Sequence, residues 1–120
     1  MNKIPITLTK EEWSSTNTWI TSASRGTFER VSKEWFTELL DIVNPFYMSL
    51  YFSDDYSAMK IPYDSEHTLE LERKYLKYLV YSVGRIAYDF DVKTPTAQEA
   101  LIIVNKLEEQ GGENWKKNRW

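Results

Sequence analysis

The hydrophobic residues between positions 65 and 91 recur with the periodicity of an α-helix. Steps of three and four residues place side chains on one face of a helix. We therefore predict a central helix over residues 68–90, around which the other elements pack. Gly84 lies inside it, and we interpret this glycine as a close approach by a neighbouring helix, with a hinge as the alternative. The apolar face consists of Leu69, Leu76, Leu79, Val83, Ile86 and Phe90.

A helix is also predicted near the N-terminus. Thr9 and Glu12 have the spacing of a capping box, and Leu8 and Trp13 occupy the positions of a hydrophobic staple around it. The helix therefore begins near Lys10, although the Ser, Thr and Asn residues that follow are poor helix formers. Before it, Ile4, Ile6 and Leu8 alternate with other residues, which indicates a short edge strand or a lead-in segment.

Two more helices complete the helical part of the fold. The first covers residues 28–43, where apolar positions again follow helical spacing. The second begins either at Thr94, with Pro95 at the first position, or at Thr96, with Glu99 completing a capping box. It runs to about Gln110, before two glycines that are typical of a helix end. Its predicted buried face consists of Ala97, Ala100, Leu101, Val104 and Leu107.

The segment after residue 43 allows two interpretations. Asn44 and Pro45 end the preceding helix or bend it, and residues 46–52 then form a short helix. The alternative is a β-hairpin at residues 47–61, which we favour because aromatic residues suit strands, while Asp and Ser suit turns. The predicted fold class is therefore mainly α, with about four helices packed on the central helix and a short hairpin at 47–61.

Composition indicates one small folded domain. Of the 120 residues, 42% are hydrophobic and 15% aromatic, which is enough for a single core. We assign residues 1–112 to one globular domain and residues 113–120 to a basic, aromatic tail. The sequence shows no secretory signal and no run near the roughly 20 apolar residues of a membrane span. We therefore expect a cytoplasmic protein with no membrane partner.

Residues that could carry catalysis or bind metals are sparse. The chain has no cysteine, which excludes disulfides and thiolate zinc sites. Its single histidine, His67, has no clustered ligands, and Asp54–Asp55 lie in no calcium-loop pattern. Phosphate-loop and nucleophile-elbow motifs are absent from the sequence. We therefore expect a non-enzymatic protein with neither metal nor cofactor.

The excess of aromatic residues is the one unusual feature. Tyrosine is enriched at protein interfaces because its ring buries area while its hydroxyl stays hydrogen-bonded. Our hypothesis is a small protein-binding module, such as an inhibitor or immunity-type protein of microbial or phage origin, that occludes a partner protein. The candidate contact residues are Tyr51, Asp54, Asp55, Tyr56, Tyr81, Tyr88, Trp115 and Trp120.

Two alternatives stay open. One is a nucleic-acid-associated regulator that uses the last helix and the tail, where Trp115 and Trp120 flank three basic residues. The formal net charge of −3 disfavours this hypothesis, because nucleic-acid binders usually present a basic surface. The other is a homodimeric structural or assembly protein that associates through the aromatic face of the central helix.

Overall fold

The computed structural model describes residues 3–25, 33–89 and 93–111. This part of the chain contains four α-helices and one two-stranded antiparallel sheet, which confirms the predicted mainly helical fold class. In chain order, the elements are β1 (Lys3–Thr9), α1 (Lys10–Arg25), α2 (Lys33–Tyr51), the 3-10 helix η1 (Ser57–Lys60), β2 (Glu66–Glu72), α3 (Arg73–Asp89) and α4 (Pro95–Gly111).

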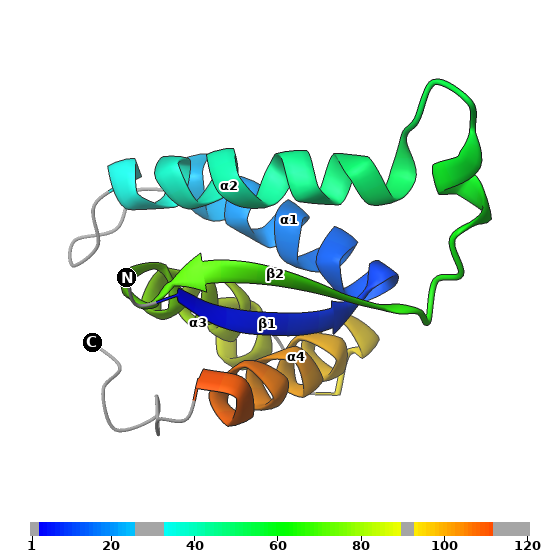
Figure 1. Cartoon of the computed structure of the whole chain (residues 1–120). Helices are drawn as coiled ribbons and strands as arrows, with labels where there is room; N and C mark the ends of the chain where they lie inside the picture. The colour runs from blue at the N-terminus through cyan, green and yellow to red at the C-terminus, as the bar shows by residue number, and fades with distance from the viewer. Residues whose placement is uncertain (1–2, 26–32, 90–92, 112–120) are drawn as a thin grey trace.

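The two strands cross the middle of the molecule (Figure 1). In this view α1 and α2 lie above the sheet, α4 lies below it and α3 lies behind it. The predicted edge strand at the N-terminus is confirmed as β1, with Ile4 opposite Leu71 and Thr9 opposite Glu66. Alternate residues of β1 turn towards the core, which is the periodicity of a half-buried strand.

The sheet lies elsewhere than predicted. Residues 47–51 continue α2, and the rest of the proposed hairpin is a connection that contains η1, so the hairpin at 47–61 is wrong. Helix α2 runs through Pro45 instead of ending at Asn44. An interior proline costs about 3 kcal/mol, but Val43 and Leu50, seven residues apart, are both buried. Burial of this continuous apolar face offsets the free-energy cost of the proline. The predicted start of this helix at residue 28 lies outside the described residues.

The central helix is shorter than predicted, because residues 66–72 form β2 and the helix begins at Arg73. In this segment, Glu and Thr alternate with His67, Leu69 and Leu71, which is the period of a strand. The seven-residue step from Leu69 to Leu76 fits a helical face, so the sequence carries both patterns. Pairing with β1 favours the strand, since it sets Leu71 beside Ile4 in the core. Four further residues of the predicted face are confirmed, since Leu76, Leu79, Val83 and Ile86 are all buried. Phe90, the last residue of that face, lies outside the described residues.

Helix α4 follows one of its two predicted starts. The Thr94 hydroxyl accepts a hydrogen bond from the backbone N–H of Ala97, 3.2 Å away, so Thr94 is the cap. Leu101 was predicted to be buried but is exposed, whereas Ile103 is buried on the inner face. These two positions lie about half a turn apart around the helix axis.

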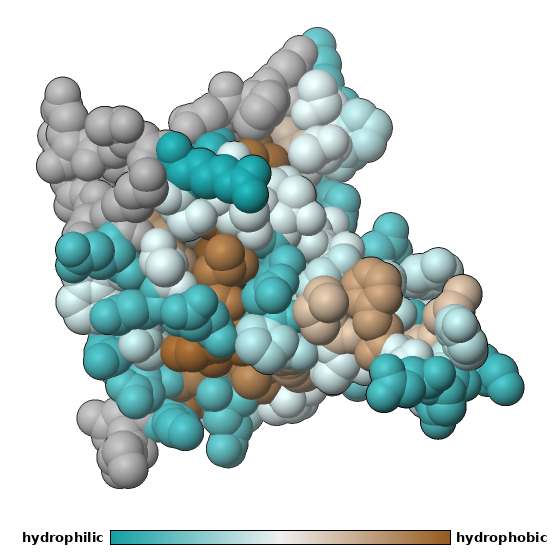
Figure 2. Space-filling view, turned by 90° about the horizontal axis from the view of Figure 1, so that it is seen from above, coloured by the Kyte–Doolittle hydropathy of each residue, from teal (hydrophilic) through white to brown (hydrophobic). Residues whose placement is uncertain are grey.

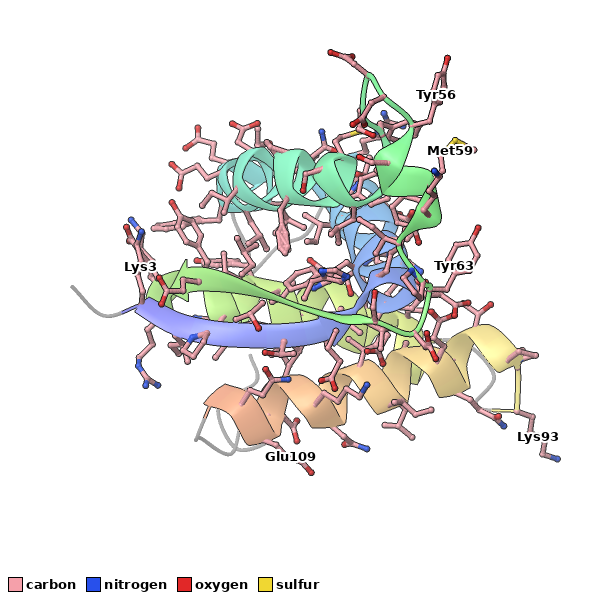
Figure 3. The ribbon with its side chains drawn as sticks, turned by 45° about the vertical axis from the view of Figure 1, so that its right-hand side comes forward. Lys3, Tyr56, Met59, Tyr63, Lys93 and Glu109 are labelled. Atoms are coloured by element: carbon pink, nitrogen blue, oxygen red, sulfur yellow. The ribbon has the colours of Figure 1, made fainter. Side chains whose placement is uncertain are left out.

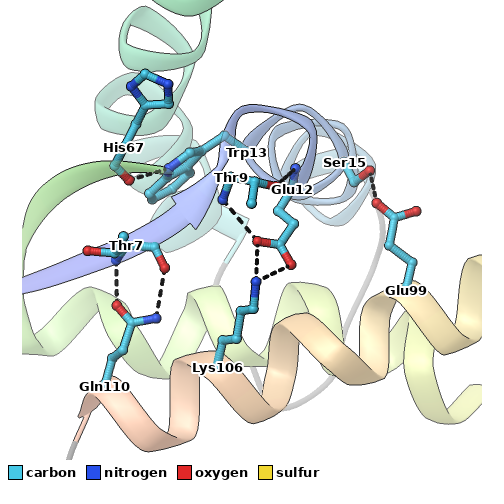
Figure 4. A network of polar contacts seen from close by, with 9 residues as sticks. All are labelled: Thr7, Thr9, Glu12, Trp13, Ser15, His67, Glu99, Lys106 and Gln110. Carbon is cyan, nitrogen blue, oxygen red and sulfur yellow. Dashed lines mark hydrogen bonds and ion pairs between the residues drawn. The ribbon is translucent and has the colours of Figure 1, made fainter. Parts of the chain in front are cut away.

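Side chains of α4 hold β1 and α1 in place (Figure 4). The predicted capping box is confirmed: Glu12 Oε1 accepts from Thr9 N–H at 2.9 Å, and Glu12 N–H donates to the Thr9 hydroxyl at 3.1 Å. Lys106 donates to both oxygens of the same Glu12 carboxylate. Gln110 bonds both backbone groups of Thr7, on the side of β1 that faces away from β2.

Candidate functional site

The connection between α2 and β2 projects from the body of the molecule (Figure 1). We call residues 52–65 the arm. Ser53 organises its first turn, because its carbonyl accepts from Tyr56 N–H at 3.1 Å and its hydroxyl accepts from Ala58 N–H at 2.9 Å. Tyr56 has a left-handed backbone with φ of 62°, a conformation that costs free energy in a residue with a side chain. The turn therefore presents Tyr56 outwards at an energetic cost.

A buried lysine fixes the base of the arm. Lys10, the first residue of α1, is 2% exposed, and its ammonium group donates to the carbonyls of Ala58 and Ile61 at 3.0 Å each. The same nitrogen lies 4.4 Å from the centre of the Tyr51 ring and 5.1 Å from that of Tyr63. Two carbonyls and two aromatic faces therefore stabilise the cation, and Lys10 forms no ion pair with any residue that the structure describes.

Four large side chains of the arm face solvent. Phe52, Tyr56, Met59 and Tyr63 are 59%, 69%, 70% and 66% exposed. We call these four residues the apolar tip. Figure 3 shows Tyr56, Met59 and Tyr63 pointing away from the body at one end of the molecule. The tip surrounds a hollow of about 290 Å³, at whose base lie Lys10 and Tyr51.

The surroundings of the apolar tip are mainly acidic. Asp54, Asp55 and Asp64 are exposed on the arm, where Lys60 is the exposed cation. The pKa of Asp55 is lowered, chiefly because Ser57 donates hydrogen bonds to its carboxylate. A second hollow, of about 460 Å³, lies beside Tyr63 and is also lined by carboxylates: Glu11, Glu12, Asp64 and Glu99. Figure 2 shows the arm from above, with hydrophobic patches next to strongly hydrophilic ones.

The structure brings together half of the residues that the sequence indicated. Tyr51, Asp54, Asp55 and Tyr56 all lie at the arm, Tyr51 at its base and the other three on it. Tyr81 lies elsewhere, half-buried on α3 with its ring 5.7 Å from that of Phe36. The side chain of Tyr88 and the whole of Trp115 and Trp120 lie outside the described residues.

Sequence reasoning missed Lys10, Phe52, Met59 and Tyr63. Lys10 resembled an ordinary polar residue in the first turn of a helix, and nothing local indicates that it reaches a segment about 50 positions away. The three apolar residues were assigned to a hairpin or a loop. One signal was available in the sequence. Phe52, Met59 and Tyr63 do not continue the helical spacing of the apolar residues of α2, which indicates that they lie outside its buried face.

The described residues contain no group of three or more His, Asp or Glu that could hold a metal ion. His67, on β2, lies with Nε2 2.8 Å from the Ser65 hydroxyl. None of the described helices is long and apolar enough to cross a membrane.

Comparison with known proteins yields no relative: no protein-family model matches the chain, and no curated protein or solved structure is significantly similar to it. The functional argument therefore rests on the arm itself.

Proposed function

We propose that this protein is a non-enzymatic binding module that occludes a partner protein, as inhibitors and immunity proteins of microbes and phages do. The observation that supports the proposal is the apolar tip, four large side chains that face solvent on a projecting and internally fixed arm. We also propose that the interaction occurs in the cytoplasm, a compartment with which a cysteine-free chain is compatible.

The exposure of the apolar tip favours a binding role over a structural one. Single exposed apolar residues are normal on protein surfaces, but groups of them mark sites of interaction. Aromatic residues and Met are also enriched at the centres of interfaces. The fold leaves Phe52, Tyr56, Met59 and Tyr63 uncovered, although it buries smaller apolar residues throughout the core.

Fixing the arm before binding favours affinity. A mobile loop loses conformational entropy when it docks, and this loss subtracts from the binding free energy. Lys10 already ties the arm to α1 through Ala58 and Ile61, and the backbone N–H of Lys10 donates to Ser65 at 2.9 Å. The apolar tip is therefore presented by a segment that is attached to the body at several points.

Charge defines the chemistry of the partner. Asp54, Asp55 and Asp64 flank the apolar tip, and electrostatic complementarity between surfaces directs both encounter and specificity. The partner surface that fits is an apolar recess bordered by Lys or Arg. A basic enzyme, such as one that acts on nucleic acid, would present such a surface. Nucleic acid itself would be repelled by the three aspartates.

The proposal is tested by affinity capture from lysate of the native host with a matched pair of variants. Phe52→Ser with Met59→Ser removes apolar area from the tip, and Leu101→Ser removes an exposed apolar residue on α4 that lines neither hollow. We expect one stoichiometric partner that the native protein and Leu101→Ser retain equally. With the purified partner, the tip variant should bind at least ~100-fold more weakly, since central hot-spot residues contribute about 2 kcal/mol or more each.

Two outcomes would contradict the proposal. One is the absence of any stoichiometric partner. The other is equal retention of a partner by the native protein and the tip variant, which would place the contact on another surface. Circular dichroism and urea unfolding must first show that the tip variant is folded, as expected for two solvent-facing positions.

A further inference from the structure

The outer edge of β2 is a row of backbone groups that point away from the sheet. Both backbone groups of Thr7 bond the side chain of Gln110 and therefore point away from β2. In an antiparallel pair, the backbone groups of two directly opposite residues either point towards each other or both point away from the partner strand. These two kinds of pair alternate along the strand. The N–H and C=O groups of Thr68, opposite Thr7, therefore point away from β1, as do those of Glu66, Glu70 and Glu72. Pro5, which has no N–H, lies opposite Glu70 and fits this pattern.

The two edges of the sheet differ in what covers them. Gln110 closes the edge of β1 next to α4. On the side of β2 that faces α2 in Figure 1, no described residue bonds the outward backbone groups of Glu66, Thr68 or Glu70. The side chains of Glu66, Thr68 and Glu70 are exposed. Unpaired strand edges are templates for a further strand.

Charge along β2 is only partly compensated within the molecule. Glu72 lies opposite Lys3 and 3.5 Å from Lys74. Glu66 and Glu70, which share its face, lie opposite Thr9 and Pro5 and form no ion pair with a described residue. The free edge therefore carries two uncompensated carboxylates four residues apart, on either side of Thr68.

These carboxylates disfavour a second copy of the same chain as the added strand. Antiparallel self-pairing centred on Thr68 would place Glu66 of each copy opposite Glu70 of the other. Centring on Glu70 would place that residue opposite itself. Like charges directly opposite each other destabilise a strand pair.

We propose that the partner protein adds a third strand to β2, as an extended segment with Lys or Arg at two positions four residues apart, opposite Glu66 and Glu70. This inference rests on the proposed function, because it gives the partner a second contact in addition to the apolar tip. The arm leads directly into β2, so both contacts lie on one continuous stretch of chain, residues 52–72. An apolar residue between the two cations would lie beside Leu69, which is only partly buried.

The proposal is tested with a nine-residue peptide of alternating Lys and Val with blocked ends. Binding should slow amide hydrogen exchange at Glu66, Thr68, Glu70 and Glu72, whose N–H groups point outwards. It should leave Leu69 and Leu71, already paired with β1, unchanged. Replacing Glu66 and Glu70 with Lys should weaken binding of this peptide at least ~10-fold and favour a peptide of alternating Glu and Val instead.

Backbone pairing is separated from simple charge attraction by N-methylated peptides. Methyl groups on the amides of the Lys residues block antiparallel pairing, and methyl groups on those of the Val residues block parallel pairing, without changing the charge. We expect one of the two peptides to lose binding and the other to retain it. The tip variant Phe52→Ser with Met59→Ser should bind the unmodified peptide normally, so failure of the edge proposal is distinguishable from failure of the proposed function.

Three results would overturn the proposal. Equal binding of both methylated peptides would show charge attraction without strand pairing. Unchanged exchange at Thr68 and Glu70 with saturating peptide would place the contact elsewhere. Concentration-dependent self-association that protects the same amides would show that a second copy covers the edge.

Discussion

The ammonium group of Lys106 lies 2.8 Å from both carboxylate oxygens of Glu12, a residue 94 positions earlier in the chain. Glu12 is largely buried and also completes the capping box at the start of α1. One carboxylate therefore stabilises a helix end and joins that end to α4. The region that connects β1 to α1 is fixed by a contact between two ends of the described chain.

Replacing Lys106 with Met should destabilise the protein by about 2 kcal/mol, because it leaves the Glu12 carboxylate largely buried without its cation. Glu12→Gln should cost less, since its amide oxygen still accepts from Thr9 and the half-exposed Lys106 remains solvated. Urea unfolding of both variants and of the double variant gives the coupling energy. An exposed control, Lys60→Met, should change stability by less than about 0.5 kcal/mol. Equal effects at Lys106 and Lys60 would contradict the prediction.

Replacing Lys10 with Met should loosen the arm. The methionine keeps an apolar stem of similar length but leaves the carbonyls of Ala58 and Ile61 without their donor, which costs about 1–3 kcal/mol for buried groups. Amide exchange should become faster at Met59 and Ile61, whose N–H groups bond within the arm. Exchange at Val83 and Ile86, which are buried in α3, should stay as it is. Unaltered protection at Ile61 would show that Lys10 does not hold the arm.

Binding provides a second measurement on the same variant. If the fixed arm is what presents the apolar tip, Lys10→Met should weaken partner binding although Lys10 itself is 2% exposed. The loss should appear mainly as a slower association, because the arm must become ordered before it docks. A faster dissociation alone would instead indicate a lost direct contact.

Replacing Gly84 with Ala should stabilise the protein by about 1 kcal/mol, the difference in helix propensity between the two residues. The sequence indicated that this glycine allows a neighbouring helix to approach closely. The structure does not support that interpretation, because a Cβ atom at Gly84 would meet nothing within 4 Å. Urea unfolding measures the change, and Ala87→Gly on the same helix should have the opposite sign. A loss of stability in Gly84→Ala would indicate a close approach or a hinge after all.

Local signals predicted the starts of α1 and α4 correctly, because each start depends on few neighbouring residues. Thr9 with Glu12 and Thr94 with Pro95 both form the expected caps. The buried face of α3 was also predictable, since four apolar residues at helical spacing have no competing pattern. In these cases the information lies within one or two turns of the chain.

The strand at 66–72 and the length of α2 could not be predicted in the same way, because distant residues decide both. Residues 66–72 satisfy the period of two and also extend the helical face, and pairing with β1, some 60 positions away, selects the strand. Pro45 is tolerated inside α2 because Phe46 packs on Trp13 of α1, with ring centres 5.1 Å apart. The apolar tip could not be predicted for the same reason, since Lys10, which belongs to α1, fixes the position of the arm that carries it.

Alkaline pH should destabilise the protein through one buried and two partly buried tyrosines. Burial raises the pKa values of Tyr51, Tyr75 and Tyr78 above the usual 10.0. Below pH 10 these phenols are neutral in both states, so their contribution is fully present. As pH rises above 10, the unfolded chain releases protons that the folded protein retains, and stability falls by up to about 1.4 kcal/mol per pH unit for each tyrosine.

Urea midpoints at pH 8, 9, 10 and 10.5 should be flat to pH 9 and then decrease. Tyr75→Phe with Tyr78→Phe should reduce that slope, whereas Tyr56→Phe, at an exposed position, should not. A slope that is identical in all three proteins would show that other groups cause the alkaline loss.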